Sequence, residues 1–229
     1  MKIDRREQLK AKKQAYVQDE IIASAVVLFA ERGFRAVTID DVAANLGYTK
    51  SVVYYYFKSK NEILWQIFNR IYDSYFEMIS SVVAKNLPPD LALRELLKGH
   101  ALLVMERRDW TAIYNREESE LDEKQLKLHV QRRREYDAVI NGVYKDGVKK
   151  GVFRDIPPSV AVAGFLGMCN SLYRWYKEQG PISAPEIADY YVDILTSGYM
   201  VPEAAKPAAN KATTARKTTT KVARAATTA

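Results

Sequence analysis

The sequence has little of what covalent, metal-based or membrane-based stabilisation requires. Cys169 is the only cysteine among 229 residues, which excludes an internal disulfide and a cluster of thiolate ligands. The two histidines, His100 and His129, have no metal-ligand spacing with the acidic residues. No stretch approaches the roughly 18 consecutive apolar residues of a membrane span, and no apolar run marks a secretory signal. We therefore expect a globular cytoplasmic protein without metal, cofactor or membrane attachment, with Cys169 buried.

Strand patterns and catalytic motifs are also missing. Alternation of apolar and polar residues is nearly absent, and so are a glycine-rich phosphate loop and a nucleophile motif. Acidic residues do cluster in segment 117–123, but they stand at an expected helix start, where they favour the helix dipole. We therefore predict an all-α fold and no enzymatic activity.

Positive charge is present and lies at both ends of the chain. Residues 1–60 carry eleven basic and seven acidic side chains, and residues 206–229 carry six basic and no acidic ones. Basic ends indicate a nucleic-acid partner. The segment from Pro202 onward is mainly Ala, Thr and Lys, so we expect a disordered tail, because it has too few apolar side chains to bury. By itself such a tail would also suit a nonspecific DNA-organising protein.

Apolar residues at helical spacing divide the chain into helices. Capping boxes begin with Thr38, Ser59 and Ser183, and Thr49 is placed to cap a further helix. The expected helices cover about 16–32, 38–46, 50–56, 59–83, 90–107, 110–117, 122–149, 158–177 and 184–200. The expected divisions are a basic N-terminal arm (1–15), a helix-turn-helix domain (16–60), a helical ligand-binding and dimerisation domain (61–201) and the basic tail (202–229).

The two short helices flank Gly47 and follow a longer helix, which is the layout of a helix-turn-helix. Apolar side chains of the short helices are expected to pack on Leu28 and Phe29. The residues left facing outward, toward a DNA major groove, are Thr49, Lys50, Ser51 and Tyr55. Three neighbours, Tyr54, Lys58 and Lys60, are placed to donate to phosphates, although Lys58 also suits a solvated surface position.

The segment TIDDVAANLGYTKSVVYYYFKSKNEIL resembles the signature of the TetR family of bacterial repressors. The resemblance covers about residues 16–65 and implies a dimer that represses transcription until a small molecule binds. It also implies DNA contacts for Thr38, Thr49, Lys50, Ser51, Tyr54, Tyr55 and Lys60. Simple packing is the alternative for the tyrosine run, and we favour packing for Tyr56 and Phe57.

Two C-terminal segments predict a subunit interface. The helix expected over 158–177 is apolar nearly all round, so it must be buried on two sides. Its small residues are Ala161, Gly164, Gly167 and Ser171, and a companion stripe consists of Ile187, Tyr190, Tyr191, Ile194 and Leu195. A two-fold homodimer follows, with its two DNA-binding units about one DNA turn, roughly 34 Å, apart on a palindromic operator.

The segments 131–153 and 170–195 are similar to a TetR subgroup that senses acyl-coenzyme A thioesters. The candidate ligand residues are Arg132, Arg133, Arg134, Tyr136, Asn170, Tyr173, Arg174 and Trp175. The arginines would pair with phosphates and the aromatic rings would line an apolar slot. The alternatives are that the arginines are solvated and Trp175 is core, and that the effector is a free hydrophobic molecule, as in repressors of multidrug genes. We expect the effector to tilt the helix over 59–83 and so change the spacing of the DNA-binding units.

Overall fold

The computed structural model describes residues 5–200, and over this range it contains helices and one isolated antiparallel bridge, Phe153–Met200, but no strand. The helices are α1 (Arg5–Arg32), α2 (Ile39–Asn45), α3 (Lys50–Tyr56), α4 (Lys60–Val83), α5 (Pro89–Glu106), α6 (Arg108–Arg116), the 3-10 turn η1 (Glu118–Glu120), α7 (Glu123–Lys149), α8 (Pro158–Asn170), α9 (Leu172–Trp175) and α10 (Ala184–Tyr199). The predicted all-α class is confirmed. No helix within this range has both the length and the apolar content needed to cross a membrane.

The first helix is longer than the sequence pattern indicated. It begins at Arg5, so most of the segment expected to be a separate arm is its first three turns. These residues are Arg, Glu, Gln, Leu, Lys and Ala, which favour a helix, but they are exposed and carry no apolar stripe that periodicity could detect. The basic tail expected over 202–229 lies outside the described residues.

Helix starts follow local capping rules with two differences. Thr38 with Asp41 and Ser183 with Glu186 form complete capping boxes. The Ser59 side chain accepts from the Glu62 amide, but the Glu62 carboxylate reaches the amide of Lys58 instead of Ser59. Thr49 occupies the N-cap position of α3 without a side-chain hydrogen bond, so the predicted capping contact is absent.

The apolar helix expected over 158–177 is broken. Helix α8 ends at Asn170, and the short α9 then runs from Leu172 to Trp175. At the break, Ser171 Oγ donates to Met168 O at 2.7 Å, a local bond that competes with the helical backbone pattern. Asn170 is held at the same point by His100 of α5. The change of direction therefore follows from side-chain hydrogen bonds that periodicity does not show.

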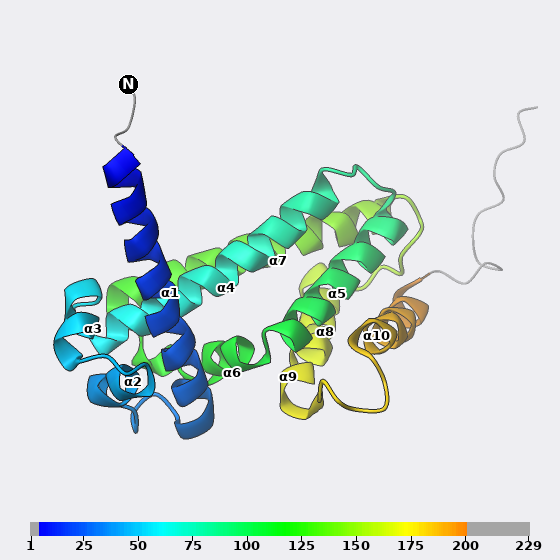
Figure 1. Ribbon diagram of the computed structural model, residues 1–229. Helices are drawn as coiled ribbons and strands as arrows, with labels where there is room; N and C mark the ends of the chain where they lie inside the picture. Colours follow the sequence, from blue (N-terminus) through cyan, green and yellow to red (C-terminus); the bar gives the residue numbers. More distant parts are fainter. Residues whose placement is uncertain (1–4, 201–229) are drawn as a thin grey trace, which may run out of the picture.

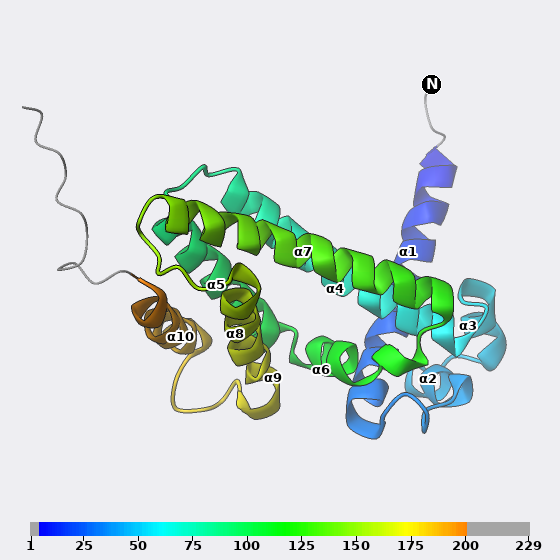
Figure 2. The same cartoon turned by 180° about the vertical axis from the view of Figure 1, so that it is seen from behind.

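Two hydrophobic cores share helix α4. One core joins α1, α2, α3 and the first half of α4, and the other joins the end of α4 with α5, α7, α8 and α10. Helices α4 and α7 lie side by side along the molecule, with α1–α3 at one end and α8–α10 toward the other (Figure 1; the reverse side is in Figure 2). Cys169 is completely buried in the second core, as predicted, and burial raises the pKa of its thiol to about 12.

Candidate functional site

Helix α3 exposes the side chains that were expected to reach DNA. Val53 is buried against the N-terminal core, and the opposite side of the helix presents Tyr54 and Tyr55, which are 46% and 69% exposed. Thr49, Lys50, Ser51 and Lys58 are exposed as well. This arrangement places polar and aromatic side chains outward on a short helix, which is the geometry that a major groove admits.

Lys50 is already paired within the protein. Its Nζ lies 2.7 Å from Asp40 Oδ2 at the start of α2, and this contact raises the pKa of Lys50. Both side chains are more than half exposed, so the ion pair exchanges readily with water. A DNA contact by Lys50 would therefore replace an existing pair.

Thr38 stabilises the start of α2. Its Oγ1 accepts from the amide of Asp41 and donates to Asp41 Oδ2 at 2.6 Å, and its amide donates to the same oxygen at 2.8 Å. These bonds, together with Arg32, lower the pKa of Asp41 to about 2. Thr38 is exposed, so its predicted DNA contact stays a prediction beside this observed capping role.

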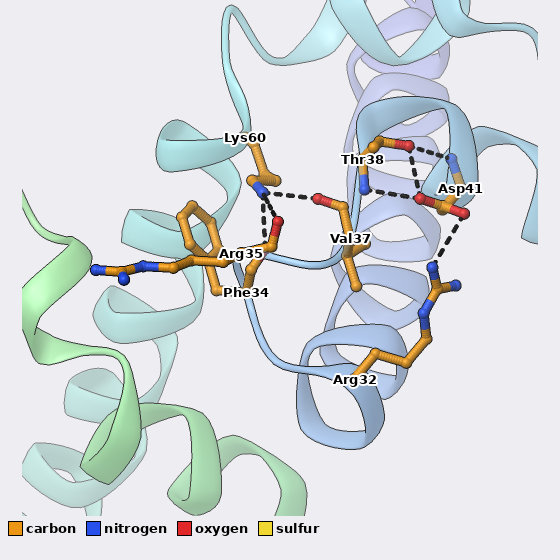
Figure 3. Close-up of polar contacts among 7 residues, drawn as sticks. All are labelled: Arg32, Phe34, Arg35, Val37, Thr38, Asp41 and Lys60. Atoms are coloured by element: carbon orange, nitrogen blue, oxygen red, sulfur yellow. Dashed lines mark hydrogen bonds and ion pairs between the residues drawn. The ribbon is translucent and has the colours of Figure 1, made fainter.

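Lys60 differs from the other predicted DNA-contact residues. Its Nζ donates to the backbone carbonyls of Phe34 and Val37, each at 2.7 Å, and lies 4.2 Å from the centroid of the Phe34 ring (Figure 3). Desolvation lowers the pKa of this half-buried ammonium. Lys60 therefore ties the start of α4 to the loop between α1 and α2, and its predicted phosphate contact stays a prediction beside this observed positioning role.

A cavity of about 310 Å³ lies in the second domain, between α4, α5, α6, α7 and α8. Its apolar wall includes Ile71, Ala163 and Leu166, and four tyrosines also line it, namely Tyr72, Tyr75, Tyr114 and Tyr136. The mixture of apolar surface and a few placed polar groups is typical of a small-molecule site.

The charged groups of the cavity lie on its exposed side. Arg133 Nη1 is 3.6 Å from Glu118 Oε2, and these side chains are 47% and 40% exposed. Asp137 also lines the cavity, and desolvation raises the pKa of its carboxyl. His129 lies behind them, almost fully buried, with Tyr72 Oη 2.7 Å from its Nδ1. Arg133 is thus the cation available to an anionic group at the mouth.

The structure brings three of the eight predicted ligand residues to this cavity, namely Arg133, Tyr136 and Asn170. The five that do not line it are Arg132, Arg134, Tyr173, Arg174 and Trp175. Arg132 instead donates to Asn69 Oδ1 at 2.8 Å. Arg134 and Arg174 are exposed on the surface of α7 and α9.

Neither reading of Trp175 fits its position. It is 49% exposed, so it is neither core nor part of the cavity wall, and its nearest aromatic neighbour is Tyr191, with ring centroids 6.3 Å apart. His100, Thr111 and Tyr114 are among the lining residues that the sequence pattern did not predict. His100 had one available signal, since it is a lone imidazole within an otherwise apolar helix face.

Helix α6 and the turn η1 contact both the cavity and the helix-turn-helix. Thr111, Tyr114 and Glu118 line the cavity. Other side chains of the same segment contact the N-terminal unit. Arg116 donates to Ala30 O, and Glu117 Oε1 accepts from the amide of Phe34. Glu120 accepts from Arg35 through its carboxylate and from Asn61 through its backbone carbonyl. Ile113 is fully buried in the N-terminal core. We call Arg108–Glu120 the joint segment.

Comparison with known families follows this division. Residues 21–67 match the model described as bacterial regulatory proteins, tetR family, and residues 86–199 match the tetracyclin repressor-like C-terminal domain. The chain belongs to the TetR family. The helix-turn-helix is thus the DNA-binding unit of a transcriptional regulator, as the resemblance implied.

Relatives of known description cover most of the chain. The HTH-type transcriptional repressor KstR2 of Rhodococcus jostii is 28% identical over 185 residues, which are 80% of this chain and 91% of the relative. A TetR/AcrR family regulator from Thermobifida fusca has a TM-score of 0.64 at 33% identity, covering 80% of this chain and 98% of its own. AibR, solved with isovaleryl coenzyme A and operator DNA, has a TM-score of 0.72 at 26% identity, covering 78% and 97%.

Proposed function

We propose that this TetR family protein is a repressor whose operator binding is relieved by an acyl-coenzyme A thioester from lipid, aromatic or steroid catabolism. Ligand-responsive repression fits the KstR2 relatives, which are transcriptional repressors, and AibR, which was solved with a thioester and operator DNA. The observation that carries the proposal is the joint segment, because one element lines the cavity and also holds the DNA-binding unit. Such a protein acts as a regulator, not an enzyme, on chromosomal DNA in the cytoplasm.

The two ends of the cavity suit the two parts of an acyl-coenzyme A thioester. An acyl group fits among Ile71, Ala163, Leu166 and the tyrosines, and Arg133 at the mouth is a cation that the coenzyme phosphates would approach. AibR is a structural neighbour that was solved with such a thioester. A free hydrophobic effector is the second candidate. The modest cavity volume of about 310 Å³ favours it, because a small hydrophobic molecule can fill the cavity without a coenzyme group that extends outside it.

A homodimer is part of the proposal. Val160, Tyr190 and Ile194 on α8 and α10 are 58–62% exposed, beside the exposed small residues Ala163 and Gly164. Exposed apolar side chains on two neighbouring helices favour burial against a second copy. The predicted composition of this face needs a correction, because the list included Ala161, Ile187 and Leu195, which are buried in the protomer's own core.

The test is fluorescence anisotropy of the pure protein with DNA flanking its own gene, at one stated salt concentration, with and without a panel of acyl-coenzyme A thioesters. Sequence-preferring binding that collapses with one thioester is expected. Specific binding that ignores the whole panel, but responds to free hydrophobic molecules, would favour the second candidate. Equal binding to every DNA sequence would instead indicate a nonspecific DNA-organising protein.

A further inference from the structure

Three side chains form a continuous polar chain at the buried end of the cavity. His100 Nδ1 is 2.7 Å from Tyr136 Oη, and His100 Nε2 is 2.9 Å from Asn170 Oδ1. The residues come from α5, α7 and α8, and all three line the cavity. His100 and Tyr136 are 4% and 6% exposed, and the ring of Tyr75 stacks on His100 with centroids 4.9 Å apart. The chain is therefore buried and fixed by packing.

The imidazole at the centre of this chain is neutral at physiological pH. Burial lowers the pKa of His100 to about 4, and the two hydrogen-bond partners of its ring are a phenol and an amide. The charged residues of the cavity, Glu118, Arg133 and Asp137, belong to its other side. One ring nitrogen of His100 then carries a proton and the other does not.

Two hydrogen-bond arrangements satisfy this neutral ring. In the first, Nε2–H donates to the Asn170 carbonyl and the Tyr136 hydroxyl donates to Nδ1, which leaves the Asn170 amide hydrogens and a Tyr136 lone pair. In the second, the amide is turned over, so that Asn170 donates to Nε2 and Nδ1–H donates to Tyr136. That leaves the Tyr136 hydroxyl hydrogen, the second Asn170 amide hydrogen and the Asn170 carbonyl. Either arrangement offers at least one donor and one acceptor.

We propose that this end of the cavity binds a carbonyl or hydroxyl oxygen carried on the apolar body of the effector. Tyr136 and Asn170 are the contacts, and His100 is a positioning residue that sets which of them donates. A carboxylate or an ammonium is disfavoured there because no opposite charge lies among these groups. The inference rests on the proposed function only in taking the cavity as the effector site, and it does not require a coenzyme A group.

The test compares three six-membered rings of similar shape with the full-length protein: cyclohexanone, cyclohexanol and methylenecyclohexane. Titration calorimetry measures their affinities in the absence of DNA. The ketone and the alcohol are expected to bind about ten-fold more tightly than the hydrocarbon. Tyr136→Phe and Asn170→Leu are expected to remove most of that preference and to leave the hydrocarbon affinity unchanged.

Tyr144→Phe is the matched control. Tyr144 is also a buried tyrosine of α7, but its hydroxyl donates to Arg154 O at 2.9 Å and it does not line the cavity, so its loss is expected to leave the preference intact. A second readout uses the two histidines, whose imidazole nitrogen resonances report the tautomers directly. The ketone and alcohol are expected to shift the His100 resonances, and the hydrocarbon to leave its tautomer unchanged.

Equal wild-type affinity for the three rings, or no detectable binding of any of them, would overturn the proposal without recourse to a variant. The outcome is separable from that of the thioester experiment. Operator release by a thioester with no preference among the rings would keep the thioester effector and reject the oxygen site. A clear ring preference without any thioester response would keep the oxygen site and reject the thioester.

Discussion

Lys58 and Lys60 are two residues apart, yet the fold gives them different surroundings. Lys58 is exposed, whereas the Nζ of Lys60 is hydrogen bonded to the loop between α1 and α2. A substitution therefore tests whether each lysine neutralises a phosphate or holds the loop.

Lys60→Ala is expected to lower the free energy of unfolding by about 2 kcal/mol, because two charge-assisted hydrogen bonds are lost. Operator affinity should fall with it, but the slope of log K against log salt should stay unchanged. Lys58→Ala should reduce that slope by about one, with no change in stability, if it contacts a phosphate. Urea denaturation and salt-dependent anisotropy measure both effects. A slope reduced by Lys60→Ala alone would restore the phosphate role to Lys60.

His100 predicts how stability depends on pH. Its folded pKa of about 4 is below the ordinary value of 6.5, so acid protonates the unfolded chain first. The stability linked to His100 is present above pH 6.5 and is lost as the pH falls toward 4, by about 2 kcal/mol at pH 5. Urea denaturation at pH 7 and pH 5 should show this loss in the wild type and a smaller loss in His100→Gln. An equal loss in both proteins would contradict the assignment.

At the scale of elements, the joint segment lines the cavity and also holds the DNA-binding unit through non-covalent contacts. Four hydrogen bonds or ion pairs leave its C-terminal half for α1, its following loop and α4. The switch expected from the sequence is a tilt of α4, a helix that also contacts α5, α6 and α7. The joint segment is a second route by which a filled cavity can displace the helix-turn-helix.

The double variant Asn61→Ala with Glu120→Gln removes two of these contacts without touching the cavity lining. We expect effector binding to be unchanged and the effector-induced loss of operator affinity to be about five-fold smaller. Anisotropy with and without effector measures this. Glu123→Gln is the control, because it makes the same carboxylate-to-amide change in an ion pair, with Lys127, outside the joint segment.

A complementary distance measurement tests the tilt of α4. Spin labels at Ser51 in the two protomers should change their separation when effector binds. An unchanged distance, with operator still released, would reject the tilt and leave loosening of the joint segment as the mechanism.

At the scale of the whole molecule, the proposed dimer would let one protein molecule contact both half-sites of an operator. Ile194→Asp places a charge on the exposed apolar face of α10, where Ile194 is 62% exposed. We expect a monomer in light scattering. We also expect operator affinity to fall by about a hundred-fold, because one DNA-binding unit replaces two linked ones. Val83→Asp, at a 54% exposed position on α4, should leave both unchanged. An Ile194→Asp protein that stays dimeric would place the interface elsewhere.

The sequence by itself determined most of the helices, the helix-turn-helix and the exposed side of α3. These features depend on signals within a few residues, such as the Thr38 capping box, Gly33 and Gly47 at positive φ, and the spacing of apolar residues. The family resemblance rests on the same short segment. Where a segment has no apolar stripe, as in the first turns of α1, the helix was missed because only propensity supports it.

Only the tertiary structure decided the cavity and the joint segment. The cavity wall is assembled from five helices and one turn, so its members are far apart in the chain and no local pattern links them. The break after Asn170 turns Arg174 and Trp175 away from it, while packing brings His100, Tyr136 and Asn170 together. The positioning role of Lys60 could not be predicted for the same reason, since its hydrogen-bond partners lie 23 and 26 residues earlier in the chain. Long-range contacts of this kind depend on how the helices pack, and the sequence pattern of one helix does not contain them.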